Sequence, residues 1–448
     1  MELWVFDRSG AYSSGPFNIH EKPDQFAGAL VGYATMDGDE RGLDTFIERT
    51  DRNRHFVLND PSGNILTIRL SRPIVRQKAI VCRGTTCYAT QDGQVAKFSW
   101  VSDKRTPEAD LLKLAQERGV EGVPKLVAYD RITSVRELRA GLAFPQRHRF
   151  RDEDSSFKDL PSTTGQKRRW PPESASDGAA GSKRCRLSSQ DSGRLQEINS
   201  GLSIKNTPSL HTTDSELWEN RVYSCLVVSP AGRVLSQFKT ARELLEALRD
   251  AIKAHRSLYI NGDILHRDVS PNNIIITRPE TTGFNGMLID LDQAKVGDGR
   301  PSGAQRQTGT VQFMALEVLR SVDHTYRHDL ESFLYVLIWM CARQSWNNAL
   351  SGVGEMRPRT DLLRNWEVGS FEEIASTKMG HVTVDGMDNI MDAFPEALDI
   401  VKPLCLRLRR ILFPLGEDER MNFGTPSGDP DQLYGPIMEA YNDTISKL

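Results

Sequence analysis

The pattern of hydrophobic and polar positions predicts a chain that is rich in strands at first and rich in helices later. Several segments near the beginning alternate between apolar and polar side chains, and this period of two is typical of half-exposed strands. Residues 64–70 show it most clearly. Strands are predicted at residues 3–6, 64–70, 79–82, 94–98, 125–129 and 221–228.

Apolar residues at spacings of three and four predict helices at residues 108–115, 241–259, 328–340 and 403–412. Pro107 suits the first turn of the first helix. The stripe of the second includes His255, which we expect to be a core or interface histidine. The third is too short to cross a bilayer, so we expect a core helix capped by Asp329. The three arginines of the fourth are expected to form salt bridges on the surface.

A change of composition at about residues 145–215 interrupts this pattern. The segment is rich in Ser, Asp, Gly, Pro, Lys and Arg and poor in apolar residues, so we expect it to be disordered. It contains two basic clusters, at 167–169 and 183–186, whose spacing suits a bipartite signal for a nuclear-import receptor. A solvated run of charges that serves no receptor is an equally open interpretation.

Length and charge narrow the class of protein. With 448 residues and 38% hydrophobic residues, the chain can bury one sizeable core or two lobes. A net charge of −3 argues against a chain-wide electrostatic footprint for nucleic acid or membrane partners. The first residues lack the features of a secretory signal, and no apolar segment approaches the roughly 18 residues of a membrane span.

The six cysteines are scattered and form no C-x-x-C pair. This usage is typical of reduced thiols in an intracellular protein, so a cytoplasmic or nuclear location is expected. Cys82 and Cys87 flank a short loop around Gly84, where a metal or redox role is a further interpretation.

The segment from Leu265 to Ile274 carries the most informative chemistry. It places Asp268 five residues before Asn273 in a proline-containing loop, and apolar runs then lead to Asp290. This His-Arg-Asp…Asn and Asp-x-x order is that of a phosphoryl-transfer site. Asp268 would orient an acceptor hydroxyl and take its proton, while Asn273 and Asp290 offer hard oxygen ligands for Mg²⁺.

The two residues before Asp268 are expected to support the site. Arg267 can meet a phosphorylated or acidic activation segment, and His266 is expected to pack behind Asp290. Residues 309–317 look like the end of such a segment, with Ala-Leu-Glu where kinases carry Ala-Pro-Glu.

Within that end, Thr310 would lie beside Asp268, and Glu317 would be structural. Thr308 and Thr310 are possible autophosphorylation sites, although a structural hydrogen bond is the more plausible role for Thr310.

A nucleotide-binding lysine is predicted upstream. Gln94–Phe98 contains a Val-Ala-x-Lys element, and Lys97 would bind the α- and β-phosphates of ATP. Glu108 follows eleven positions later at the start of a predicted helix and is the candidate ion-pair partner of Lys97. Asp110 is a weaker rival, because its helix position points elsewhere. The plain alternative is that Lys97 is an exposed strand lysine.

On these motifs the chain resembles the fungal-type protein kinases, a divergent branch of the eukaryotic protein-kinase-like superfamily. The resemblance covers nearly the whole chain outside residues 145–215. It rests on the segments 3–10, 42–45, 82–88, 254–256, 266–273 and 289–292.

The resemblance implies an α+β, bilobal protein-kinase-like fold with a small β-rich N-lobe and a mainly helical C-lobe. Residues 1–75 would form an N-terminal extension packed on the kinase. The N-lobe would span 76–228, with the insert at about 145–215, and the C-lobe 229–448. Residues 228–232 would connect the lobes beside adenine, and Asp329 matches the kinase aspartate that holds the catalytic-loop backbone.

Three positions depart from the usual kinase pattern. Gly84 is the single glycine of the expected phosphate loop, where its nucleotide role competes with an ordinary hairpin turn and where Thr85 and Thr86 could supply hydroxyls. Ser270 stands where serine/threonine kinases carry a lysine that meets the γ-phosphate. Asp292 replaces the glycine of Asp-Phe-Gly, which stiffens this loop and brings a third acid near a second metal site.

The leading hypothesis is therefore an ATP- and Mg²⁺-dependent kinase that phosphorylates Ser or Thr hydroxyls of a protein substrate. A pseudokinase that binds nucleotide without turnover is an alternative of another class, motivated by the three departures. A small-molecule kinase is a third possibility, although residues 309–317 resemble a peptide-docking segment that such enzymes lack.

Overall fold

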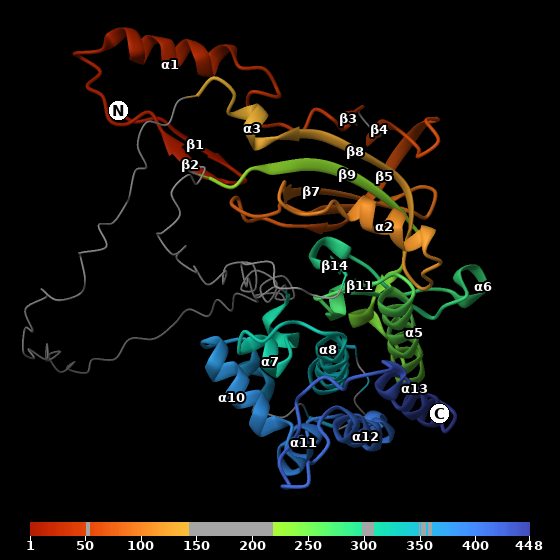
Figure 1. Cartoon of the computed structure of the whole chain (residues 1–448). Coiled ribbons are helices and arrows are strands. Elements are labelled where there is room, and N and C mark those ends of the chain that lie inside the picture. The colour runs from red at the N-terminus through yellow and green to blue at the C-terminus, as the bar shows by residue number, and fades with distance from the viewer. Residues whose placement is uncertain (51–53, 143–217, 298–308, 349, 351–354, 357–360) are drawn as a thin grey trace, which may run out of the picture.

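The computed structural model describes the chain except residues 51–53, 143–217, 298–308, 349, 351–354 and 357–360. The expected disordered segment at about 145–215 and both basic clusters therefore lie outside the described residues. Figure 1 shows a β-rich N-terminal part above a helical C-terminal part. This mixed α+β arrangement is consistent with a kinase-like fold.

Within the described chain, seven antiparallel strands form the main sheet, in the order β3-β4-β5-β6-β7-β9-β8. The aromatic rings of Phe56 and Phe98 pack edge to face in its apolar layer, with centroids 5.3 Å apart. The strands are β3 (Glu48–Arg49), β4 (Arg54–Asn59), β5 (Ile65–Arg76), β6 (Thr86–Thr90), β7 (Val95–Ser102), β8 (Lys125–Ser134) and β9 (Arg221–Ser229).

The expected boundary at residues 75 and 76 falls inside β5. This strand pairs with β4 at its start and with β6 at its end, where Arg76 lies opposite Thr86. The residues before 76 therefore contribute three strands to the same sheet as the lysine strand β7.

The prediction of a strand at residues 79–82 is wrong. These residues form a loop between β5 and β6, in which Ile80 and Val81 are 55% and 56% exposed. The guanidinium of Arg8 donates to the carbonyls of Ala79 and Ile80 at 2.7 and 3.0 Å. Because a side chain takes these acceptors, no strand partner uses them.

A small N-terminal hairpin, β1 (Trp4–Asp7) and β2 (Gly10–Ser13), lies beside the beginning of β9 (Figure 1). Arg139, just after α3 (Val135–Leu138), donates to the carboxylate of Asp7 at 2.7 and 2.8 Å. This largely buried pair ties the hairpin to the end of the β8 segment. Helix α1 (Pro23–Thr35) lies farther out and has no buried residue.

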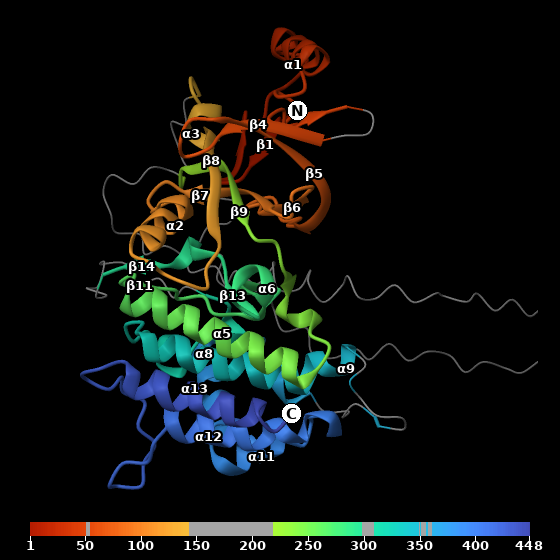
Figure 2. The ribbon, with the colours of Figure 1, turned by 90° about the vertical axis from the view of Figure 1, so that its right-hand side faces the viewer.

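The C-terminal part is a stack of helices, in which α5, α8, α13 and α12 lie in successive layers (Figure 2). No helix of the described residues has the length and apolarity needed to cross a membrane. The helices are α5 (Ala241–Ile260), α6 (Pro279–Thr282), α7 (Leu316–Leu319), α8 (Tyr326–Trp339), α9 (Ser345–Asn347), α10 (Phe371–His381), α11 (Val384–Met391), α12 (Lys402–Leu412) and α13 (Asp431–Ile445).

Short elements connect these helices and carry the loops of the site. The strands β10, β12 and β13 form one small sheet, and β11 pairs with β14. They are β10 (Arg233–Val234), β11 (Ile264–Leu265), β12 (Ile274–Ile276), β13 (Gly286–Leu288) and β14 (Lys295–Val296). Single turns are η1 (Leu235–Gln237), η2 (Pro271–Asn273), η3 (Leu291–Gln293), η4 (Val311–Phe313), η5 (Met340–Gln344), η6 (Leu362–Trp366) and η7 (Glu396–Val401).

The main apolar core joins both parts of the molecule. Helix α2 (Glu108–Glu117) buries four apolar side chains in the same cluster as α5 and α8. Burial of this face fixes α2 against the helical part, because each of its two buried leucines contributes about 1.5–3 kcal/mol. The start of α2, which carries Glu108, is thereby held at the junction between the two parts.

The four predicted helices are present, with two corrections in detail. Asp329 does not cap α8: the helix begins at Tyr326, Thr325 is its N-cap, and the Asp329 side chain is fully buried. In α12, Arg409 is also buried and donates to the carbonyl of Val382, because that helix turns this residue toward the core. His255 is fully buried, as expected.

Candidate functional site

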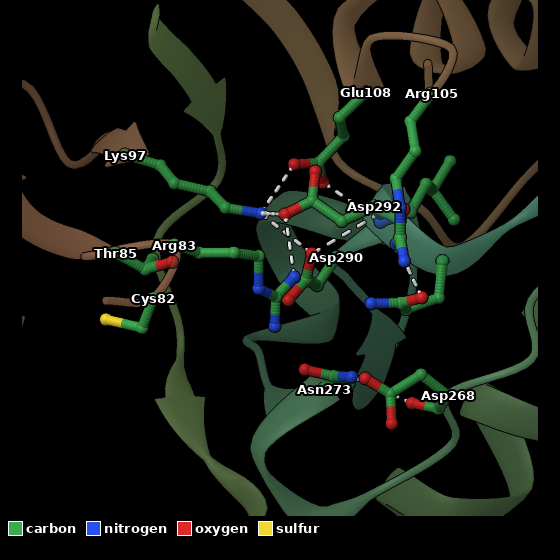
Figure 3. A network of polar contacts seen from close by, with 12 residues as sticks. Cys82, Arg83, Thr85, Lys97, Arg105, Glu108, Asp268, Asn273, Asp290 and Asp292 are labelled. Carbon is green, nitrogen blue, oxygen red and sulfur yellow. Dashed lines mark hydrogen bonds and ion pairs between the residues drawn. The ribbon is translucent and has the colours of Figure 1, made fainter. Parts of the chain in front are cut away.

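Lys97, in the middle of the sheet on β7, is surrounded by three carboxylates (Figure 3). Its Nζ lies 2.6 Å from Glu108 Oε2, 2.7 Å from Asp290 Oδ1 and 2.9 Å from Asp292 Oδ2. An ammonium group has three N–H donors, so all three are used by these carboxylates. The alternative of an exposed strand lysine is excluded, since the Lys97 side chain is 11% exposed.

Glu108 links the sheet to the helical part. Its second oxygen, Oε1, accepts a hydrogen bond from the backbone N–H of Leu291 at 3.0 Å. Leu291 directly follows Asp290, so one glutamate holds both the lysine strand and the Asp-x-Asp turn. The rival Asp110 lies on the exposed side of α2 and faces Lys113 at 4.0 Å.

Burial and the ion pairs with Lys97 shift the pKa values of the clustered side chains in opposite directions. Burial raises the pKa of Glu108 to about 7, although Lys97 opposes this effect. Burial would also raise the pKa of Asp290, but Lys97 and Arg83 outweigh it and hold that pKa below its ordinary range. Burial would lower the pKa of Lys97, yet Asp290, Asp292 and Glu108 keep it well above its usual value. The lysine therefore remains a cation.

Two arginines that the sequence patterns did not point to complete this cluster. Arg83 Nη1 lies 3.1 Å from Asp292 Oδ2, and Arg105 Nη1 donates to the Asp292 carbonyl at 3.1 Å. Arg105 also donates to Gln293 Oε1 at 2.6 Å. The buried carboxylate of Asp292 is bound by Arg83 and Lys97, and its carbonyl is bound by Arg105. The turn that carries Asp292 is therefore fixed by side chains from the loop before β6, from β7 and from the segment before α2.

Gly84 lies in the loop between β5 and β6 and has a positive φ of 57°. A Cβ atom here would lie 2.5 Å from Cζ of Arg8, which is far inside van der Waals contact. Glycine therefore allows the Arg8 guanidinium to lie against the backbone here, and a side chain at this position would displace it. This contact with Arg8 involves no nucleotide.

The neighbours of Gly84 have local hydrogen bonds. Cys82 Sγ accepts from the Gly84 N–H at 3.1 Å, and the Thr85 N–H donates to Gln77 Oε1 at 3.2 Å. Thr86 Oγ1 donates to the Gly84 carbonyl at 3.3 Å. All five cysteines of the described chain have free thiols, and burial raises the pKa of Cys87 to about 12, so this thiol is not a reactive thiolate.

Asp268 lies in the loop after β11, where one of its oxygens is fixed. Its Oδ1 accepts from the N–H and from Oγ1 of Thr310, both at 2.9 Å. Its carbonyl accepts from Asn273 Nδ2 at 2.7 Å. Among the described residues, Oδ2 accepts no hydrogen bond and is available to a hydroxyl. Burial, helped by the charge of Asp290, raises the pKa of Asp268.

Asp329 anchors this loop from below, although it lies 61 positions after Asp268. Its carboxylate accepts from the Arg267 N–H at 3.1 Å and contacts the Nε2 atoms of His255 and His324 at 2.9 and 2.8 Å. His266 Nε2 lies 3.1 Å from the carbonyl of Ile289, directly before Asp290. Its position agrees with the expected packing behind that aspartate.

The expected contact between Arg267 and an activation segment cannot be placed, because residues 298–308, including Thr308, lie outside the described chain. Within the described residues, Nε of Arg267 is buried and has no hydrogen-bond partner. Arg267 has a positive φ of 68°, which the hydrogen bond from its N–H to Asp329 helps to hold.

The end of the predicted activation segment is fixed to the helical part. Glu317 Oε2 lies 2.8 Å from His328 Nε2, in agreement with a structural role. Lys378 Nζ donates to the Met314 carbonyl at 2.6 Å and lies 4.2 Å above the ring of Tyr335. Burial lowers the pKa of Lys378 to about 7. Sequence reasoning missed this lysine because it lies 64 positions from its partner.

Asp290 and Asn273 offer oxygens that fit a hard cation. In the described structure no hydrogen bond reaches Asp290 Oδ2 or Asn273 Oδ1, while their other side-chain atoms are engaged. The Asp290 side chain is 23% exposed. Carboxylate and amide oxygens are the ligands that Mg²⁺ prefers. The carboxylates of Glu108, Asp290 and Asp292 form another possible metal site, because one oxygen of each lies within 4.8 Å of the others. Lys97, however, already binds all three carboxylates.

Comparison with known proteins gives two matches. Residues 1–341 match a family model described as fungal protein kinase. The chain is also 28% identical over 151 residues to a protein from Oryza sativa subsp. japonica named "Protein kinase and PP2C-like domain-containing protein". That match covers 31% of this chain and 21% of the rice protein, so this chain aligns with about a fifth of its relative.

Proposed function

Because the chain belongs to the fungal protein kinase family, we propose that it transfers the γ-phosphoryl group of ATP to Ser or Thr hydroxyls of a protein substrate. The resemblance drawn from the sequence motifs is thus confirmed at the level of the family. Kinase membership implies a phosphotransferase that uses ATP. The observation that best supports the finer proposal is the junction of Lys97, Glu108 and Asp290 near a loop that carries Asp268 and Asn273.

Each side chain has a role that its contacts support. Asp268 uses its unbonded Oδ2 to orient the acceptor hydroxyl and to take its proton, while Thr310 fixes Oδ1. The raised pKa of Asp268 suits a proton acceptor, since a more basic carboxylate binds the proton more firmly. Asp290 Oδ2 and Asn273 Oδ1 would hold Mg²⁺, which would neutralise negative charge on the phosphoryl group that ATP supplies.

Lys97 must exchange at least one carboxylate to bind phosphate, because its three donors are already used. Glu108 keeps the lysine in place during such an exchange, since Glu108 is itself held by the Leu291 N–H. Arg267 would act through the loop backbone, which its N–H ties to Asp329.

Nucleotide binding without turnover is the second candidate. It is favoured by the saturated Lys97, because a lysine that stays bound to three acids cannot neutralise a phosphate. A small-molecule kinase is less well supported, since residues 309–317 are fixed by Lys378 and Glu331 in a manner suited to a docking platform for a peptide.

The test separates binding from transfer. Affinity for Mg-ATP and transfer of labelled γ-phosphate to a generic protein acceptor are measured for the wild type, Asp268→Ala and Asp290→Asn, with the exposed Asp385→Ala as a control. Asp268→Ala should bind Mg-ATP nearly normally and lose about 10²–10⁴-fold in transfer. Asp290→Asn should lose phosphate transfer, and its affinity for ATP should no longer depend on Mg²⁺. Unchanged transfer by Asp268→Ala would remove its proposed role.

A further inference from the structure

Arg83 is a second cation of the site that presents unused donors. A guanidinium has five N–H donors, and within the described residues one hydrogen bond from Arg83 is found, to Asp292 Oδ2 at 3.1 Å. The Arg83 side chain is 30% exposed, whereas that of Lys97 is 11% exposed with all donors engaged. Arg83 therefore has the greater capacity to receive an anion without first losing its present partners.

The position of Arg83 connects the two ends of the site. In Figure 3 its guanidinium lies beside Asp290, between the Lys97 cluster and the loop that carries Asn273 and Asp268. The charges of Asp290, Asp292 and Asp268 all act on it and outweigh burial, so the pKa of Arg83 is raised. Arg83 in turn acts on Asp268.

The backbone that carries Arg83 is held in place. Its carbonyl accepts from the Trp100 N–H on β7 at 2.7 Å, and the next residue, Gly84, donates to Cys82 Sγ. Arg8 fixes the preceding turn through two carbonyls. A charged group on a fixed backbone is preorganised, so little reorganisation is needed when a charge develops near it.

Charge balance gives this arginine a function. The carboxylates of Glu108, Asp268, Asp290 and Asp292 converge on the site, and Lys97 is shared among three of them. A triphosphate adds further negative charge at short range, and a second protein cation beside the terminal phosphate would, together with Mg²⁺, offset this charge.

We propose that Arg83 binds the terminal phosphate of the nucleotide and stabilises it during transfer, using the donors that face away from Asp292. The inference rests on the proposed function, since it names the cation that this site uses. It also assigns a role to Asp292, whose carboxylate holds the guanidinium ready on one side while the free donors face the phosphate.

The test measures binding without turnover. Calorimetric titration with Mg²⁺ and adenylyl imidodiphosphate, a non-hydrolysable ATP analogue, is compared with Mg-ADP for the wild type, Arg83→Gln, Arg83→Lys and Arg105→Gln. Arg83→Gln should weaken binding of the analogue about tenfold or more and change ADP binding less than about twofold. Arg83→Lys should lie between, because it keeps the charge but has fewer donors.

Arg105→Gln is the matched control, since Arg105 belongs to the same network but donates to a backbone carbonyl and an amide oxygen. It should affect both nucleotides alike. Normal ADP binding shows that a variant is folded. An equal loss for both nucleotides in Arg83→Gln, or no loss, would overturn the assignment.

Transfer assays on the same proteins separate this inference from the proposed function. If the wild type transfers phosphate but Arg83→Gln still binds the analogue more tightly than ADP, as the wild type does, only the role of Arg83 is refuted. A wild type that never transfers phosphate, yet prefers the analogue through Arg83, refutes only the proposed turnover.

Discussion

Replacing Gly84 with alanine tests how the N-terminal hairpin holds the loop before β6. A residue with a side chain at a φ of 57° is strained by about 1–2 kcal/mol. The new Cβ would lie 2.5 Å from Cζ of Arg8, so the guanidinium must move and give up its bonds to two carbonyls. These bonds are partly solvent-exposed, and their loss adds about 1–2 kcal/mol. Gly84→Ala should therefore lower the free energy of unfolding by about 2–4 kcal/mol.

A double-mutant cycle with Arg8→Ala separates the two contributions. Without the guanidinium, Gly84→Ala should cost the backbone strain alone, about 1–2 kcal/mol. Gly93→Ala is the matched control, because Gly93 also has a positive φ, of 71°, and open space where the Cβ would lie. Denaturant unfolding of the four proteins and the control gives each value. If Gly84→Ala cost the same with and without Arg8, the packing argument would be refuted.

Three further variants test other parts of the site. Thr310→Val removes the hydroxyl bond to Asp268 and keeps the backbone bond, so kcat should fall about tenfold with unchanged Mg-ATP affinity; an unaltered kcat would contradict this role. Asp329→Ala leaves the Arg267 N–H and two histidines without their acceptor and should cost about 3–5 kcal/mol of unfolding free energy; a loss below about 1 kcal/mol would argue against the anchor. Between pH 7 and 10.5 the unfolded chain holds a proton that folded Lys378 has lost, so wild-type stability should rise with pH by up to about 1.4 kcal/mol per unit. Lys378→Met should remove this contribution, and parallel stability profiles of the two proteins would contradict it.

The parts of the site that could be predicted from sequence are those set by short stretches of chain. Lys97 and Glu108 are eleven residues apart on a strand and the helix that follows, so their meeting depends on one connection. Asp268 and Asn273 share one loop, where spacing alone fixes which atoms can meet. The three-carboxylate environment of Lys97 is only partly predicted, because the motifs pair Lys97 with Glu108 and assign Asp290 and Asp292 to the metal sites.

The missed features depend on contacts between distant segments. Arg83 reaches Asp292 across 209 positions, and Arg8 reaches Ala79 across 71, so no local period signals either contact. The contact of Arg8 explains why the strand predicted at residues 79–82 is absent. Their apolar character resembles a strand, but the carbonyl groups are bound by a distant arginine, and β5 supplies the strand instead.

The most direct test of the central claim is a single-turnover experiment with the protein in excess over labelled Mg-ATP and a degenerate peptide library. Excess enzyme makes a slow reaction visible, so a low rate is not mistaken for none. We expect γ-phosphate to appear on Ser- or Thr-containing peptides with the wild type and not with Asp268→Ala. Label that remains on ATP throughout, in a protein that binds Mg-ATP, would contradict the account and favour a nucleotide-binding module without turnover.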